Sequence, residues 1–271
     1  MSFQTLSEAL AQFEGDTGAR VALTARFAED SKPIFSWRGS ERFDAASVMK
    51  IPVMAEVFRL IHLGQLQWEQ PVVVDSLFHS IADDSPFSVE DEGNLRPHIG
   101  GTVSLGMLVR EMIILSDNLA TNLILRLTGT PRVTRLLRDY DAVDCYVLRH
   151  LMDVEASKLG IKNRLTTDGM TSFILAIATN QFPWGDACSK MQEILEAQHY
   201  REMIPAGLPA PWRCGNKTGW EVDHAHDCGY IFLPDDRVLG VTLLSDQLPP
   251  HIKGGSFAPA LIRELIRALG Y

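Results

Sequence analysis

The sequence lacks any hydrophobic run that is long enough to cross a membrane. No stretch of the 271 residues approaches the ~20 consecutive apolar positions that a transmembrane helix requires. Residues 1–8 also lack the basic stretch, followed by an apolar one, that marks a secretory signal peptide. As written, the sequence predicts a cytoplasmic protein, or a periplasmic or secreted one if a leader was trimmed from it.

Cysteine is scarce, and its four positions are far apart. The gaps between Cys145, Cys188, Cys214 and Cys228 are 43, 26 and 14 residues, so no pair has the C-x-x-C spacing of a zinc ribbon. Cys214 and Cys228 flank an expected hairpin, where a disulfide bond is one interpretation. Four buried free thiols are the favoured interpretation for a chain without an export signal.

An excess of positive charge is also absent. Asp and Glu number 34 against 25 Lys and Arg, which gives a formal net charge of -9. Nucleic acids and anionic membranes attract clustered Lys and Arg, so we expect neither as a partner. Hydrophobic residues make up 46% and charged residues 22% of the chain, as is typical of a globular protein. The length suffices for one large domain.

Hydrophobic periodicity predicts a helix, two strands, a long helical insertion, three strands and a final helix. Asp44 is the expected N-cap of the second helix and Gly64 its stop. The expected helices are residues 4–14, 45–63, 104–115, 119–127, 132–140, 168–178, 186–197 and 257–269, and the expected strands are residues 19–27, 33–37, 213–220, 228–233 and 238–245.

Short turns between consecutive strands favour antiparallel pairing. We therefore predict an α/β (α+β) fold, with a five-stranded antiparallel sheet flanked by helices and an inserted all-α subdomain. Residues 1–64 and 201–271 would form the α/β subdomain and residues 65–200 the all-α subdomain, together making one catalytic domain. The long polar loops at 79–103 and 141–167 are expected to form walls of a substrate site.

Three short motifs carry candidate chemistry, and the first is Ser47-Val48-Met49-Lys50. Residues three apart on a helix share a face, and a desolvated lysine can accept the proton of a serine nucleophile. A serine in the first helical turn also lies beside backbone N–H groups that stabilise developing negative charge. The alternative is a capped helix start followed by a surface lysine.

The second motif is Ser116-Asp117-Asn118 and the third is Lys217-Thr218-Gly219. Ser116 is a candidate for moving a proton with Lys50, and Asn118 for binding a substrate amide. Lys217 and Thr218 are candidates for binding a substrate carboxylate, beside Gly219, which permits close approach. The backbone N–H of Trp220 would complete an oxyanion hole with that of Ser47. Taken singly, the second motif also fits an interhelical turn and the third an exposed edge strand.

Together and in this order, the motifs resemble those of the class A β-lactamase-like serine hydrolases, a superfamily that includes penicillin-binding proteins. The resemblance extends over most of the chain. It includes residues 43–46 before the nucleophile, 103–106 and 120–125 around the second motif, and 226–230 after the third. It implies acylation at Ser47, catalytic roles for Lys50, Ser116 and Lys217, and substrate contacts from Asn118, Thr218, Gly219 and Trp220. It also implies no cofactor or metal and a small β-lactam or peptide-like amide substrate, and it leaves the oligomeric state open.

The loop from Arg149 to Thr167 departs from this resemblance. In the well-known β-lactamases it holds an E-x-x-L-N string, whose glutamate activates the water that breaks the acyl-enzyme. That string is absent here, and Leu165 stands where an aspartate partner of the loop arginine is expected. Asp153 and Glu155 are the candidate deacylation bases, although their i, i+2 spacing directs them to different sides of a helix.

Three functions follow as hypotheses. The first is a β-lactamase that hydrolyses its acyl-enzyme. The second is a penicillin-binding, DD-peptidase-like or esterase relative that deacylates slowly because the loop glutamate motif is absent. The third is a non-catalytic binding or sensor domain. The pair His224 and His226 suggests a metal site in isolation, but it falls at an expected hairpin and the family uses no metal.

Overall fold

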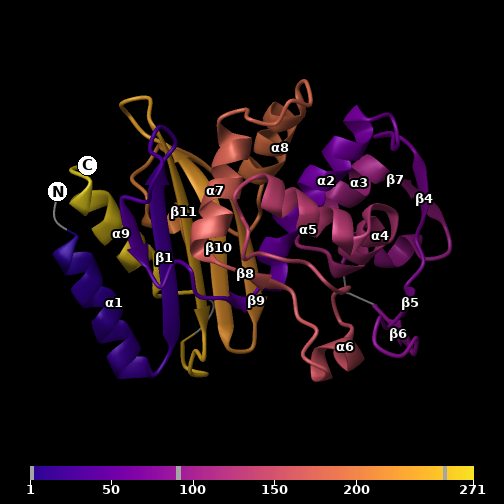
Figure 1. The fold of residues 1–271 in the computed structure, drawn as a ribbon, viewed down its shortest axis with the longest axis horizontal. Coiled ribbons are helices and arrows are strands. Elements are labelled where there is room, and N and C mark those ends of the chain that lie inside the picture. The colour runs from indigo at the N-terminus through magenta and orange to yellow at the C-terminus, as the bar shows by residue number, and fades with distance from the viewer. Residues whose placement is uncertain (1–2, 90–92, 253–254) are drawn as a thin grey trace.

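A five-stranded antiparallel sheet organises the chain in a computed structural model that describes residues 3–89, 93–252 and 255–271 (Figure 1). The strand order is β2-β1-β11-β10-β9, which confirms the predicted sheet. The bounds are β1 Arg20–Phe27, β2 Phe35–Trp37, β9 Arg213–Glu221, β10 His224–Phe232 and β11 Val238–Asp246. The sheet therefore joins strands from both ends of the chain, with β9 at one open edge.

One face of the sheet is covered by α1 (Gln4–Thr17) and α9 (Ala258–Ala268), which lie side by side in Figure 1. Alternate residues of β1, including Val21 and Leu23, face these helices, as the two-residue repeat of a strand requires. Helix α1 was expected to end at residue 14. It continues to Thr17 because the left-handed conformation that ends it, φ 72°, falls at Gly18.

The other face packs against α7 (Thr167–Ala178) and the helical part of the chain. Gly240 of β11 allows this packing, since a Cβ there would lie 2.6 Å from Leu175 of α7. The remaining long helices are α2 (Lys50–His62), α3 (Leu105–Ile114), α4 (Asn118–Thr128), α5 (Thr130–Asp139) and α8 (Ala187–Glu196). Among the described residues, none of the helices has the length and apolarity needed to cross a bilayer.

The two long segments expected as loops contain short regular elements. Three two-stranded sheets pair β3 (Phe43–Asp44) with β8 (Arg164–Leu165), β4 (Pro71–Val73) with β7 (Thr102–Ser104), and β5 (Leu77–His79) with β6 (Pro86–Ser88). A five-residue helix, α6 (Val154–Lys158), lies in the second segment. Strands of two or three residues give too little periodicity to be recognised in the sequence.

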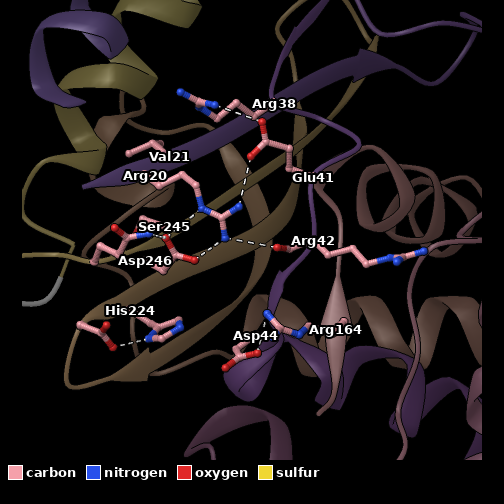
Figure 2. A network of polar contacts seen from close by, with 12 residues as sticks. Arg20, Val21, Arg38, Glu41, Arg42, Asp44, Arg164, His224, Ser245 and Asp246 are labelled. Atoms are coloured by element: carbon pink, nitrogen blue, oxygen red, sulfur yellow. Dashed lines mark hydrogen bonds and ion pairs between the residues drawn. The ribbon is translucent and has the colours of Figure 1, made fainter. Parts of the chain in front are cut away.

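Asp44 does not cap the second helix, contrary to expectation. The segment starts as a 3-10 turn over Ala46–Met49 and becomes α-helical only at Lys50. The Asp44 carboxylate instead pairs with Lys162 at 2.9 Å and with Arg164 at 2.8 Å, and Figure 2 shows the second pair. These ion pairs tie the approach to Ser47 to the end of the 141–167 segment.

A polar network around Arg20 fixes the same approach from the sheet side (Figure 2). The Arg20 guanidinium pairs with Asp246 at the end of β11 and with Glu41 at 3.1 Å, and it donates to the Arg42 carbonyl at 3.3 Å. Arg38 pairs with the other oxygen of Glu41 at 3.0 Å. The segment that precedes the nucleophile is thus joined to the middle of the sheet.

The four cysteines are buried free thiols, as predicted. Cys214 lies opposite Ile231 on the sheet face that packs against α1 and α9. Cys228 lies opposite Lys217 on the other face, where its thiol contacts the Met170 carbonyl. The two side chains point to opposite sides of the sheet, so they cannot be bridged without rearranging the strands.

His226 is a buried structural residue and shares no ligand site with His224. Its Nε2 lies 2.8 Å from the Asp44 carbonyl, and its Nδ1 accepts a hydrogen bond from the Ser245 backbone N–H at 3.1 Å. Because Nδ1 accepts, Nε2 carries the proton that is donated to Asp44, and the ring is neutral. Burial lowers the pKa of His226 to about 4.

We predict that His226 makes the fold sensitive to acid. The unfolded chain binds a proton at this histidine below pH 6.5, whereas the folded chain does so only near pH 4. The contribution of His226 to the free energy of unfolding is therefore at its maximum above pH 6.5. It falls by about 3 kcal/mol as the pH drops to 4. Urea unfolding at pH 7, 5 and 4 measures the slope. A His226→Gln variant is expected to be less stable at pH 7 and to lose this part of the slope, and equal slopes would contradict the assignment.

Candidate active site

Two lysines converge on one serine hydroxyl at the centre of the site. Lys50, the first residue of α2, places its Nζ 3.2 Å from Ser116 Oγ, 2.7 Å from the Ser116 carbonyl and 2.8 Å from Asn118 Oδ1. Lys217 of β9 places its Nζ 2.9 Å from the same Oγ and 2.8 Å from the Thr218 carbonyl. Both lysine residues are fully buried. Residues more than 160 positions apart thus form one polar cluster with Ser116 between the amines.

Ser47 lies in the 3-10 turn, directly against β9. A Cβ on Gly219 would be 3.0 Å from the Ser47 backbone nitrogen and 3.1 Å from the Ala46 Cβ, so only glycine allows β9 to run this close. Ala46 has a positive φ of 41°. Such strain in a residue with a side chain persists only where the surroundings enforce it, and it is common at functional sites.

The open edge of β9 directs backbone groups toward Ser47. In a strand, the N–H and C=O of one residue point to the same side, and the side alternates along the chain. The Thr218 carbonyl accepts from the Lys217 amine rather than from β10, so residue 218 faces the open edge. The backbone N–H of Trp220 therefore also faces that edge, beside the turn that holds Ser47.

The Thr218 side chain lies on the sheet face opposite to that of Lys217. Thr218 is paired with Asp227 across the strands, and directly opposed residues share a face. Burial raises the pKa of Asp227 to about 6, although its carboxylate accepts from Asn216 Nδ2 and the Ile204 N–H, both at 2.9 Å. Burial also lowers the pKa of Lys217 to about 7, against the attraction of Asp227. Burial thus favours the neutral amine at Lys217, and the neighbouring carboxylate favours the charged one.

A cleft of about 460 Å³ opens over Ser47. Its lining includes Ala46, Ser47, Asn118, Arg149, Leu151, Met152, Asp153, Val154, Ser157, Trp220, Glu221, Val222 and Asp223. One wall is therefore the segment 149–157 and the other is the β9–β10 hairpin. Four of the predicted residues line the cleft, namely Ser47, Asn118, Asp153 and Trp220, and the lysine cluster is reached through Asn118.

Neither candidate deacylation base lies free in the cleft. Asp153 caps α6, and its oxygens accept from Ser80 Oγ at 2.7 Å and from the Ile81 and Ala156 N–H groups, each at 3.1 Å. Glu155 is partly exposed and pairs with Lys158 at 2.7 Å. Asp153 therefore joins the loop to the segment after β5, and Glu155 is held by an ion pair outside the cleft lining.

Leu151 is a site residue that the sequence did not reveal. Its side chain lines the cleft with Ser47, and its backbone is fixed by buried Asn122, which accepts from the Leu151 N–H at 2.8 Å and donates to its carbonyl at 2.9 Å. An apolar side chain is thus held firmly where the wall meets the site. A leucine in an irregular loop carries no local signal, so only the Asn122 contact identifies this position.

Asn163 closes the neck of the 149–163 segment, where the resemblance implies a pair between the loop arginine and an acid. Its Oδ1 accepts from the Leu148 and Arg149 N–H groups at 2.8 and 3.0 Å, and its Nδ2 donates to the Arg149 carbonyl at 3.1 Å. Its own carbonyl accepts from the Ala45 N–H at 3.0 Å. Leu165, at the position expected for an acid, is fully buried in the core.

We predict that Asn163→Ala loosens this segment. The substitution leaves two backbone N–H groups without their acceptor, which costs about 1–3 kcal/mol for a buried group. Limited proteolysis should then cut within 149–163 faster than in the wild type, and the urea midpoint should fall. Asn94→Ala, at an exposed asparagine, is the matched control and should change neither. Unchanged protease sensitivity of Asn163→Ala would show that other contacts hold the loop.

The fold and the site together define a class of protein, and comparison with known proteins shows which family this class is. Residues 3–269 match the model of the "Beta-lactamase enzyme family". The chain belongs to this family of hydrolases, as the three motifs predicted. It is 25% identical over 270 residues to a beta-lactamase of Streptomyces lavendulae, covering 96% of this chain and 85% of that protein. It is also 25% identical over 216 residues to beta-lactamase Toho-2 of Escherichia coli, covering 79% and 71%.

Solved structures share the whole fold. A beta-lactamase from Sphaerobacter thermophilus superposes with a TM-score of 0.86 at 26% identity, covering 100% of this chain and 98% of that one. PBP-A superposes with a TM-score of 0.83 at 17% identity, covering 98% and 96%. At that identity the second likeness concerns the fold alone.

Proposed function

We propose that this protein is a serine hydrolase that is acylated at Ser47 by β-lactam or related amide substrates. Ser47 Oγ attacks the substrate carbonyl while its proton passes to the Lys50 amine. The proton then reaches the leaving nitrogen through Ser116 as the C–N bond breaks. The observation that carries this proposal is the Ser116 hydroxyl between two buried lysine amines, beside a cleft that contains Ser47.

The backbone supplies the electrostatic part of the mechanism. The N–H groups of Ser47 and Trp220 lie where Gly219 brings β9 against the nucleophile turn, so both can donate to the oxyanion of the tetrahedral intermediate. Asn118 lines the cleft and is a candidate to bind the substrate amide. Lys217 supplies positive charge to Ser116 and to a substrate carboxylate, and Thr218 and Gly219 belong to the same edge.

We further propose that the acyl-enzyme is hydrolysed slowly, which favours the penicillin-binding or esterase-like alternative. Hydrolysis needs a base that positions a water over the ester. Leu151 occupies the cleft wall, the Asp153 oxygens accept three hydrogen bonds, and Glu155 is paired with Lys158. A related fold, a variant of PBP-A, was solved as an acyl-enzyme complex with penicillin G.

An intact-mass time course with benzylpenicillin tests both parts. We expect the wild type to gain the mass of the drug and a Ser47→Ala variant to gain none. The adduct should persist long after excess drug is removed. Absence of any adduct together with unchanged drug would contradict acylation, and rapid loss of the adduct would contradict slow hydrolysis. A pure binding domain would retain the drug reversibly and show no covalent mass in either protein.

A further inference from the structure

The cleft has an unusually apolar rim. Met152, Val154 and Val222 line it and are at least half exposed, which is uncommon for side chains of this kind. Met152 and Val154 belong to one wall, whereas Val222 is at the tip of the opposite β9–β10 hairpin. Leu151 and Trp220 continue the two apolar walls inward toward Ser47. Exposed apolar side chains that gather at one cleft mark a binding surface.

The backbone conformation of Met152 is a second, independent observation that this rim has a binding role. Met152 has a φ of 63°, a left-handed conformation that is costly for a residue with a side chain. It is held between Leu151, whose backbone is fixed by Asn122, and Asp153, whose carboxylate caps α6. Local strain that the neighbouring contacts maintain is typical of a ligand-binding segment.

The charges at the mouth of the cleft, away from Lys217, indicate that the part of the substrate that lies there is uncharged. Arg149 is the one cationic residue among the lining residues of the cleft, and it stands against Asp153, Glu221 and Asp223. Glu221 and Asp223 flank Val222 on the hairpin tip. An acyl group bearing a carboxylate would meet these acids at the mouth, whereas an uncharged apolar group would contact only the apolar walls.

We propose that the cleft selects substrates whose acyl group is an extended, uncharged apolar chain, which lies between the 151–154 wall and the β9–β10 hairpin. The inference rests on the proposed acylation at Ser47, since the walls converge on that residue and the occupant must present its carbonyl there. The cleft volume of about 460 Å³ is within the usual range for a small-molecule site. In the test reaction, Ser47 Oγ bonds to the acyl carbon, the ester C–O bond breaks, p-nitrophenolate leaves, and the serine proton passes to Lys50.

The experiment measures the first-turnover burst of p-nitrophenolate from p-nitrophenyl acetate, butyrate and hexanoate, so slow hydrolysis does not obscure it. A fully buried methylene raises the acylation efficiency by about fourfold, and a partly buried one by less. We expect hexanoate to exceed acetate by at least about tenfold. The p-nitrophenyl monoester of glutaric acid should react about tenfold more slowly than the butyrate ester, because its carboxylate meets the acidic mouth. The p-nitrophenolate released by the Ser47→Ala variant, measured in parallel, gives the background from other groups and is subtracted from the wild-type signal.

A triple variant, Met152→Gln, Val154→Thr and Val222→Thr, tests the rim at nearly constant side-chain size. The ratio of hexanoate to acetate efficiency is expected to fall to about threefold or less. Val73→Thr, at an exposed valine of β4 outside the cleft, is the matched control and should keep the wild-type ratio. A wild-type ratio near one, or a ratio that survives in the triple variant, overturns the proposal. The penicillin adduct separates the two failures: an adduct with a flat ratio rejects only the apolar selection, whereas a burst that survives Ser47→Ala without an adduct rejects both.

Discussion

A Lys50→Met variant is expected to form the penicillin adduct at Ser47 about 10²- to 10⁴-fold more slowly than the wild type. Methionine fills most of the buried volume of Lys50 but cannot accept a proton. It also removes the donor to the Ser116 carbonyl and to Asn118 Oδ1. Serine is a weak nucleophile without an adjacent base, so the acylation rate should decrease strongly even if the variant folds normally. Stopped reactions analysed by intact mass give the rate.

The control for this variant is Lys158→Met, which changes an exposed lysine whose ion pair is with Glu155. It should acylate at the wild-type rate. Thermal unfolding of both variants shows whether any loss in Lys50→Met reflects the site or the fold. A folded Lys50→Met protein that acylates normally would remove Lys50 from the mechanism and leave Lys217, through Ser116, as the base.

A Leu151→Glu variant is expected to shorten the lifetime of the acyl-enzyme by about 10²-fold or more, which is the usual contribution of a positioned general base. The side-chain oxygen and nitrogen of Asn122 both hydrogen-bond to the backbone of residue 151. The new carboxylate would therefore extend into the cleft from a backbone that is held in place. Because residue 151 and Ser47 line the same cleft, we expect the carboxylate to activate a water beside the ester. The measurement is the decay of the penicillin adduct after removal of free drug.

Leu151→Gln is the matched control, because glutamine has the size and polarity of glutamate without its basicity. We expect its adduct to decay at the wild-type rate. If both substitutions accelerate decay equally, then access of water, rather than the missing base, limits hydrolysis. If neither does, Asn122 does not direct this position at the reacting ester. The ratio of the glutamate to the glutamine decay rate should rise from pH 5 to pH 7, because the glutamine side chain does not titrate and every other titratable group is common to both variants.

The sheet and the three motifs were predictable because each depends on local signals. The strands are runs of eight or nine mostly buried residues bounded by turns, and the motifs combine reactive side chains at fixed spacing. The absence of the usual glutamate string from the loop is visible in the sequence itself. The convergence of Lys50 and Lys217 on the Ser116 hydroxyl oxygen depends on tertiary structure and is visible only in the fold.

The rest of the site could not be predicted because it depends on contacts between distant segments. Asp44 has the residue type of an N-cap, but two cations from residues 162 and 164 compete successfully for its carboxylate. Asp153 looks like a free acid in the sequence, and it is instead enclosed by donors from the segment after β5. Asparagine and leucine in a loop rarely indicate a functional site. The roles of Asn163 and Leu151 follow only from the residues that they contact in the fold.

The pairing of β1 with β11 has a consequence for how the protein is made. Arg20 and Asp246 are 226 positions apart, yet they lie opposite each other at one end of two adjacent strands of the sheet. A ribosome adding about 5–20 residues per second must therefore work for about 10 s or longer after β1 emerges before its partner exists. During that time Ser47 and Lys50 have been synthesised, but Gly219 and Lys217 have not. The nascent chain should thus remain unreactive until β9, one of the last three strands, has left the exit tunnel.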